Sequence, residues 1–364
     1  IEQMTSGAFP QLVLNQLTDL SEYRKAQVDK NVKGHIAALM NFQTKDGGFS
    51  YWPGENQSDE WGTNYAGNFL LEAQDRGYAV SSQLLQQWNT YQRSKANAWM
   101  PSTTNFYGGD ITQAYRLYLL ALAKTPELGA MNRLKEFKYI SPQAKWRLAA
   151  AYKLAGQNNT ALQLISGLPI ILTTKNQGGM SYGSNMRDEA MILETLTLMD
   201  KRTLAADLVT SLAAKLSDDS WYSTQTTAYS LIAIAKFCGK NPSGAKITAT
   251  GTINGKAVNI NSASYVTQLP LDLKQGSSKV SINNKGTNIL YARIISEGQP
   301  LTGENLQVNN DPSILVLNVS YLTRDLKPID INRLIRGTYF GAKVTIKNPG
   351  RRGYYERMAL TQIF

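Results

Sequence analysis

The sequence predicts a multidomain protein in which an array of helical hairpins is followed by antiparallel β domains. Before about residue 243, apolar side chains recur with the period of an amphipathic helix, and after it they alternate with the period of a strand. The chain has 364 residues, of which 42% are hydrophobic and 18% charged, so it is long enough to bury more than one core. No apolar run reaches about 18 residues, so no transmembrane helix is predicted.

The helical period is clearest at Ala114, Leu117, Tyr118, Ala121 and Leu122, which follow the i, i+3, i+4, i+7, i+8 stripe of a helix with one buried face. Short polar loops with Gly or Pro separate this stretch from similar ones. The other predicted helices cover 28–43, 61–76, 81–94, 142–155, 185–199, 202–215 and 222–238.

A weak internal repeat marks the turns between these helices. The segment 45–52 (KDGGFSYW) is echoed by 176–183 and more loosely by 218–223. Helix pairs that cannot bury their apolar faces alone must stack or close on themselves. The Gln-x-x-Asp-Gly-Gly-Phe form at 43–49 resembles the turns of α/α toroids such as terpenoid cyclases.

An enzyme on such a toroid needs acidic clusters or a zinc site in its centre. The chain has one cysteine, Cys238, and one histidine, His35, which disfavours zinc, so no cofactor or metal is predicted. A glycan-active toroid would need paired carboxylates, and the adjacent Asp188 and Glu189 would diverge on a helix. Cys238 is expected to be a small buried side chain near a helix end.

The second half reads as strands. Residues 246–253 and 256–260 alternate around Asn254-Gly255, a strong hairpin signal. Further strands are predicted over 278–282 and 289–295, and a second β unit that starts near 306 contains 314–321 and 342–348.

Several helical segments are similar to the bacterial, periplasmic branch of the alpha-2-macroglobulin family. They are 61–73, 113–123, 129–134, 182–190 and 223–229. The resemblance implies an α/α-toroid, thioester-like domain at 1–243, the C-terminal half of a CUB-like β domain at 244–305, and the truncated start of a macroglobulin-like β-sandwich at 306–364.

The opening residues Ile1, Glu2 and Gln3 then resemble the last three positions of the family's Cys-x-Glu-Gln thioester motif. The cysteine partner would precede Ile1 and is absent from this chain. In that chemistry the thiolate and the glutamine acyl group, about one helical turn apart, form an activated ester that can acylate an amine or hydroxyl.

Five aromatic residues are predicted to shield such a thioester from water, with core or rim packing as the alternative: Trp52, Trp61, Tyr65, Tyr107 and Tyr182. Eukaryotic members of the family have a histidine about a hundred residues after the motif. Here 103–110 contains none, so direct attack by an amine is the expected route.

The resemblance implies a non-catalytic part of a protease trap that serves bacterial defence. Target proteases are the expected partners, and the protein is expected in the periplasm. The resemblance also admits a cell-envelope partner and an inner-membrane lipid anchor outside this chain. A thioester-less scaffold that binds partners without covalent chemistry is the main alternative.

No nucleic-acid partner is predicted, although the net charge is +11. Nine Lys or Arg against three Asp or Glu lie in 314–364 without a nucleic-acid motif.

Overall fold

The computed structural model describes residues 1–101, 109–172, 181, 183–218, 220–239, 247–262, 266–271, 278–286, 290, 292–295 and 315–348. The chain divides into two compact units, Ile1–Tyr291 and Ala292–Phe364. The predicted domain boundaries at 243 and 305 both lie outside the described residues and stay predictions.

The first unit contains the predicted helices. Its elements are α1 (Glu2–Ala8), η1 (Phe9–Val13), α2 (Leu14–Leu17), α3 (Glu22–Leu39), η2 (Met40–Phe42), α4 (Glu60–Asp75), α5 (Ser82–Ala98), α6 (Gly109–Leu122), α7 (Leu128–Lys135), α8 (Pro142–Leu154), α9 (Asn158–Ile165), α10 (Asn185–Leu198), α11 (Arg202–Leu216) and α12 (Thr224–Gly239). Polar N-caps set several starts: the side chains of Ser21, Asp59 and Ser141 accept from backbone N–H groups three residues later. Because Ser21 caps α3, that helix begins six residues before the predicted position.

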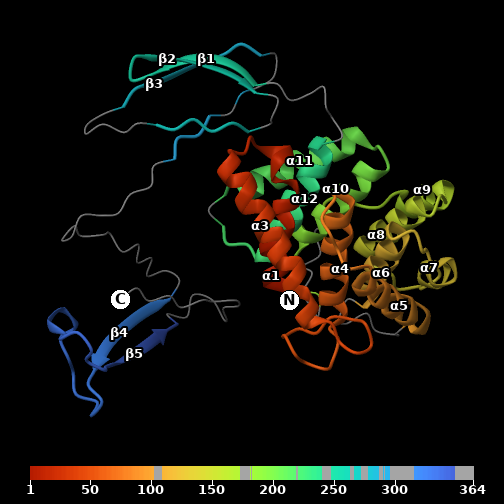
Figure 1. Ribbon diagram of the computed structural model, residues 1–364, viewed down its shortest axis with the longest axis horizontal. Helices are drawn as coiled ribbons and strands as arrows, with labels where there is room; N and C mark the ends of the chain where they lie inside the picture. Colours follow the sequence, from red (N-terminus) through yellow and green to blue (C-terminus); the bar gives the residue numbers. More distant parts are fainter. Residues whose placement is uncertain are drawn as a thin grey trace. The chain divides into compact units, whose positions relative to one another are not determined.

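The helices close into a ring (Figure 1). α1 packs on α4, α4 on α6, α6 on α8, α8 on α10, α10 on α12, and α12 returns to α1. The helices α3, α5, α7, α9 and α11 pack outside this inner ring. The arrangement confirms the predicted α/α toroid.

Burial distinguishes the inner helices from the outer ones. In α10 every residue from Met186 to Thr197 is buried, whereas α11 buries only Ala205, Leu208 and Leu212. An inner helix contacts neighbours all round, so its polar side chains must find partners inside the protein.

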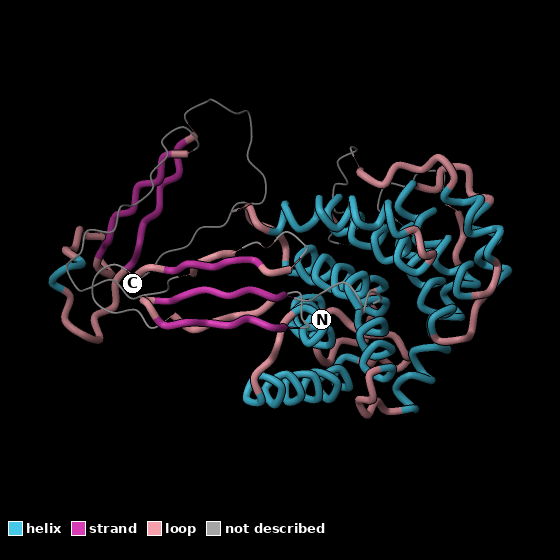
Figure 2. The backbone as a smooth tube through the Cα atoms, turned by 90° about the horizontal axis from the view of Figure 1, so that it is seen from above, coloured by secondary structure: helices cyan, strands magenta, loops and turns pink. Residues whose placement is uncertain are grey.

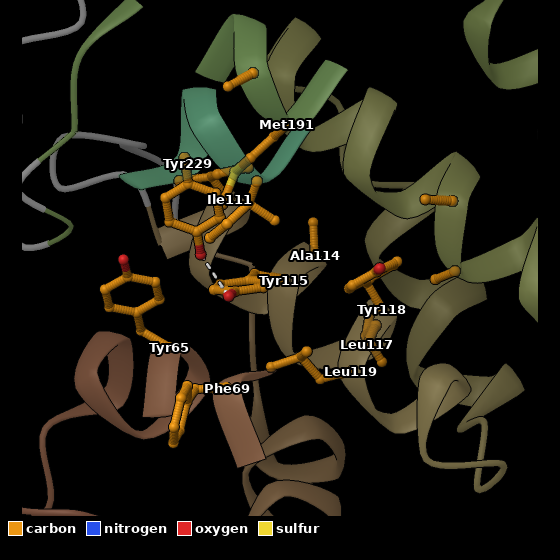
Figure 3. Close-up of a cluster of buried hydrophobic side chains, with 14 of the residues drawn as sticks. Tyr65, Phe69, Ile111, Ala114, Tyr115, Leu117, Tyr118, Leu119, Met191 and Tyr229 are labelled. Carbon is orange, nitrogen blue, oxygen red and sulfur yellow. Dashed lines mark hydrogen bonds between the residues drawn. The ribbon is translucent and has the colours of Figure 1, made fainter. Parts of the chain in front are cut away.

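Aromatic side chains fill the centre of the ring (Figure 3). Tyr65 of α4 stacks on Tyr229 of α12 at a centroid distance of 5.1 Å, and the Tyr229 hydroxyl donates to that of Tyr115 of α6. Gly67 allows α4 to approach α5, because a Cβ there would collide with the Trp88 indole.

Two small antiparallel sheets carry the β regions (Figure 2). In the first unit, β1 (Ile247–Ile253) pairs with β2 (Lys256–Ser262) and with β3 (Val280–Asn284), in the order β2-β1-β3. The β1–β2 turn is the predicted Asn254-Gly255, with positive φ at both residues, 49° and 82°. In the second unit, β4 (Val316–Leu322) pairs with β5 (Gly341–Lys347).

The prediction of a strand over 289–295 was wrong at its described positions. Leu290 and residues 292–295 are not in a strand. Alternation alone does not make a strand, because the backbone also needs a neighbour to pair with, and no described residue pairs with these positions.

Among the described helices, none combines the length and the apolar character needed to cross a bilayer.

Candidate functional site

The predicted motif lies in the first turn of α1, on the inner ring. The backbone nitrogen of Ile1 donates to the carbonyl oxygen of Tyr51 at 2.9 Å. The Ile1 side chain is buried against Gly62 of α4, where an added Cβ would lie 2.6 Å from Ile1 Cγ2. Thr5 Oγ1 donates to the Ile1 carbonyl oxygen at 2.9 Å, so both sides of this residue are fixed.

Glu2 joins the two ends of the ring. Its buried Oε1 accepts from Ser6 at 2.9 Å and from Thr224, at the start of α12, at 3.2 Å. Ser6 also hydrogen-bonds the hydroxyl of Tyr65 at 3.2 Å. Glu2 therefore holds α1 in the gap between α12 and α4.

Gln3 is exposed, unlike its two predecessors. Within the described part of the chain, its carboxamide makes no hydrogen bond. The first turn thus has two anchored residues and one available carboxamide.

The predicted shielding residues lie in different environments. Trp52 is 63% exposed, and its ring lies edge-on to the ring of Tyr51 at a centroid distance of 5.4 Å. The carbonyl oxygen of Tyr51 is the one that accepts the hydrogen bond from Ile1. Trp61 and Tyr65 are buried in the core, with Trp61 between Tyr115 (5.2 Å) and the Arg187 guanidinium (4.3 Å). Tyr107 and Tyr182 lie outside the described residues, and the shielding role stays a prediction.

A second polar cluster, which the sequence did not predict, occupies the middle of the ring. Glu194 of α10 pairs with Arg147 of α8 and with Lys236 of α12, and Lys236 also pairs with Glu72 of α4. Arg76 pairs with Glu72 at 2.5 Å. Four inner helices therefore share one ion-pair network.

Electrostatics keeps this network charged. Burial alone would raise the pKa of Glu194, but the charges of Arg147 and Lys236 outweigh it and lower that pKa to about 2. Burial opposes the charged forms here too, but the charges of Lys236 and Arg76 lower the pKa of Glu72, and those of Glu194 and Glu72 raise the pKa of Lys236.

The residues weighed as enzymatic groups have structural partners. The Arg187 Nε donates to Asp188 at 2.7 Å, and Glu189 pairs instead with Lys215 at 2.5 Å, so the two adjacent carboxylates diverge as predicted. Ser184 caps α10, because its side chain accepts from the backbone N–H of Arg187.

The lone histidine and the lone cysteine are both buried. His35 meets Phe69 edge-on at 4.7 Å, and burial lowers its pKa to about 4. Cys238 is buried near the end of α12, and burial raises its pKa to about 11, as expected of a packed, unreactive thiol.

The ring and the sheets together have the fold of the C-terminal region of bacterial alpha-2-macroglobulins. Salmonella alpha-2-macroglobulin reacted with methylamine superposes with a TM-score of 0.66 at 20% identity, over 95% of this chain and 23% of that one. Native Escherichia coli alpha-2-macroglobulin, from domain MG7 to the C-terminus, gives 0.61 at 22% identity, over 90% and 52%.

The curated relatives carry the same name and confirm the resemblance seen in the sequence. Alpha-2-macroglobulin of Escherichia coli K12 is 26% identical over 338 residues, which is 85% of this chain and 19% of that protein. The Nostoc alpha-2-macroglobulin homolog is 22% identical over 330 residues, 83% of this chain and 16% of that protein. The chain therefore spans about a fifth of the length of these relatives. No protein-family model matches it.

Proposed function

We propose that this chain is the part of a bacterial macroglobulin-like protease trap that carries the acyl group of an internal thioester. The observation that carries the proposal is the first turn of α1, where Ile1 and Glu2 are anchored and Gln3 is exposed. In this role the chain is an inhibitor module rather than an enzyme.

The chemistry needs a cysteine bonded to the Ile1 nitrogen. Its thiolate and the Gln3 side-chain acyl group would join with loss of ammonia. An attacking amine forms a C–N bond to the Gln3 Cδ, the C–S bond breaks, and the proton lost by the amine is taken up by the departing thiolate or by water. The product is an amide that links Gln3 to the attacker.

The relatives support the wider setting. One solved structure is Escherichia coli alpha-2-macroglobulin activated by porcine elastase, and another is the same protein activated by trypsin. We extend this to proteases as the partners of the present protein, to a periplasmic location and to a role in bacterial defence. A cell-envelope partner and an inner-membrane lipid anchor belong to the same proposal.

Treatment of the intact protein with isotopically labelled methylamine tests the thioester. We expect one label on Gln3 and one new thiol per label. A Gln3→Ala variant should take up no label, while Gln86→Ala, which removes an exposed glutamine of α5, should behave like the parent.

The scaffold alternative predicts the opposite result. Neither label nor thiol would appear in the parent protein, and partner binding would be unchanged by Gln3→Ala.

A further inference from the structure

The Glu2 carboxylate belongs to the residue next to Gln3, and it is held at one oxygen only. Glu2 is 9% exposed, and its Oε1 accepts from the hydroxyls of Ser6 and Thr224. Its Oε2 accepts no hydrogen bond from a described residue, yet it is not enclosed by protein, so it keeps contact with solvent. One oxygen is therefore fixed, and the other is available to accept a proton.

The environment of Glu2 contains no compensating cation. Its partners are two neutral hydroxyls, and no described Lys or Arg side chain forms an ion pair with it. Burying most of a carboxylate without a cation is costly. A carboxylate in the first turn of a helix gains stability from the helix dipole, but this gain does not require burial. The position of Glu2 therefore points to a chemical use for its carboxylate.

The proposed attack by an amine releases a proton, and the groups near the first turn of α1 offer few acceptors for it. Burial raises the pKa of Tyr65, which hydrogen-bonds Ser6, well above its ordinary value, so its hydroxyl stays protonated. The single histidine, His35, has a buried Nε2 that an incoming amine does not reach. Asp59 is a second carboxylate near Ile1, but its Oδ1 caps α4.

We propose that Glu2 is the proton acceptor for an amine that attacks the Gln3 acyl group. The inference rests on the proposed function, and it assigns a residue to the proton transfer in that reaction. Adjacent side chains of a helix do not face each other, so the proton passes from the amine to Glu2 through one water. Ser6 and Thr224 act as positioning residues, because they fix Oε1 and leave Oε2 free.

The step balances in atoms and electrons. A neutral amine forms a C–N bond to the Gln3 Cδ, and its N–H proton passes to Glu2 Oε2. The C–S bond breaks, and its electron pair leaves with the sulfur as a thiolate. Glu2 then gives the proton to the thiolate or to water, which restores the carboxylate.

The test is the rate constant for uptake of labelled methylamine by the intact protein and by its Glu2→Gln variant. Glutamine keeps an oxygen that accepts from Ser6 and Thr224, but it is not a proton acceptor at neutral pH. We expect the rate constant to fall at least about a hundredfold, while the final amount of label and the melting temperature hold. A solvent deuterium isotope effect on the rate constant of the parent should disappear in the variant.

The matched control is Asp59→Asn, which neutralises the other carboxylate near Ile1 and keeps a helix cap. Its rate constant should equal that of the parent. Thr224→Val removes one hydrogen bond to Oε1 and should slow uptake by about tenfold, whereas Thr224→Ser should restore the parental rate.

Uptake by Glu2→Gln at the parental rate, or equal slowing in Asp59→Asn, would overturn the role of Glu2 and leave the thioester in place. Less label in Glu2→Gln at an unchanged rate constant would assign Glu2 a structural role only. A parent protein that takes up no label rejects the proposed function, and this inference with it.

Discussion

Two polar regions of the helical ring differ in how their groups are used. In the centre, Lys236 pairs with both Glu194 and Glu72, and these two carboxylates also pair with Arg147 and Arg76, respectively. At the edge, in the first turn of α1, Gln3 is exposed and its carboxamide makes no hydrogen bond to a described residue. The centre thus has the character of a structural device, and the proposed function places the reactive group at the edge.

The comparison teaches where each kind of substitution should act. Changes in the centre should lower stability, because they leave a buried charge without its partner. Changes at the edge should alter amine chemistry and leave stability almost unchanged, because the groups concerned carry little of the packing.

The largest stability effect is expected for Glu194→Gln. The change leaves Arg147 and Lys236 buried with only Glu72 to balance them, which should cost about 3 to 5 kcal/mol of unfolding free energy. Urea denaturation measures this, with Asp200→Asn as the exposed control. A loss below about 1 kcal/mol would show that the central pairs are no stronger than surface ones.

The next effect is a pH dependence that His35 confers. Its ordinary pKa of 6.5 falls to about 4 in the folded protein, chiefly through burial, so between these values the unfolded state binds the proton first. Stability should therefore fall as pH drops from about 6.5 to about 4, by on the order of 3 kcal/mol, and this contribution then levels off.

A His35→Gln variant separates the pH dependence due to His35 from that due to Glu194 in the centre. When the free energy of unfolding of this variant is measured along a pH series, it should no longer decline between pH 6.5 and pH 4 because of His35. The contribution of Glu194, whose pKa is lowered from 4.5 to about 2, is present above pH 4.5 and should still be lost as the pH falls toward 2. If the unfolding free energy of the variant depended on pH above pH 5 as steeply as that of the parent, this pH dependence could not be assigned to His35.

A smaller effect is expected for Tyr229→Phe. The variant removes the hydroxyl that donates to Tyr115 but keeps the ring stacked on Tyr65, so it should cost about 1 kcal/mol. Tyr222→Phe, which removes a hydroxyl bonded to the half-exposed end of α11, is the control. Equal losses of unfolding free energy in the two variants would mean that a hydrogen bond in the centre of the ring stabilises the protein no more than one near its surface.

The sequence predicted the local structure well, because local structure depends on near neighbours. The stripe at Ala114–Leu122 and the turn at Asn254-Gly255 are both where their patterns place them. Closure of the ring rests on contacts such as Glu2 with Thr224, which are 222 residues apart, and periodicity does not encode such pairings.

The site was predicted only in part for the same reason. Gln3 followed from a motif, but the packing of Ile1 against Gly62 at the start of α4 follows from closure of the ring. Nothing in the sequence showed that the charges of Glu194 and Lys236 meet.

The most direct test of this division is methylamine uptake at Gln3, measured by mass spectrometry on the intact protein and on its Glu194→Gln and Gln3→Ala variants under folding conditions. We predict stoichiometric label in the parent and in the folded fraction of Glu194→Gln, and none in Gln3→Ala. Label that persists in Gln3→Ala, or that is absent from the parent, would contradict the assignment of the reactive acyl group to the first turn of α1.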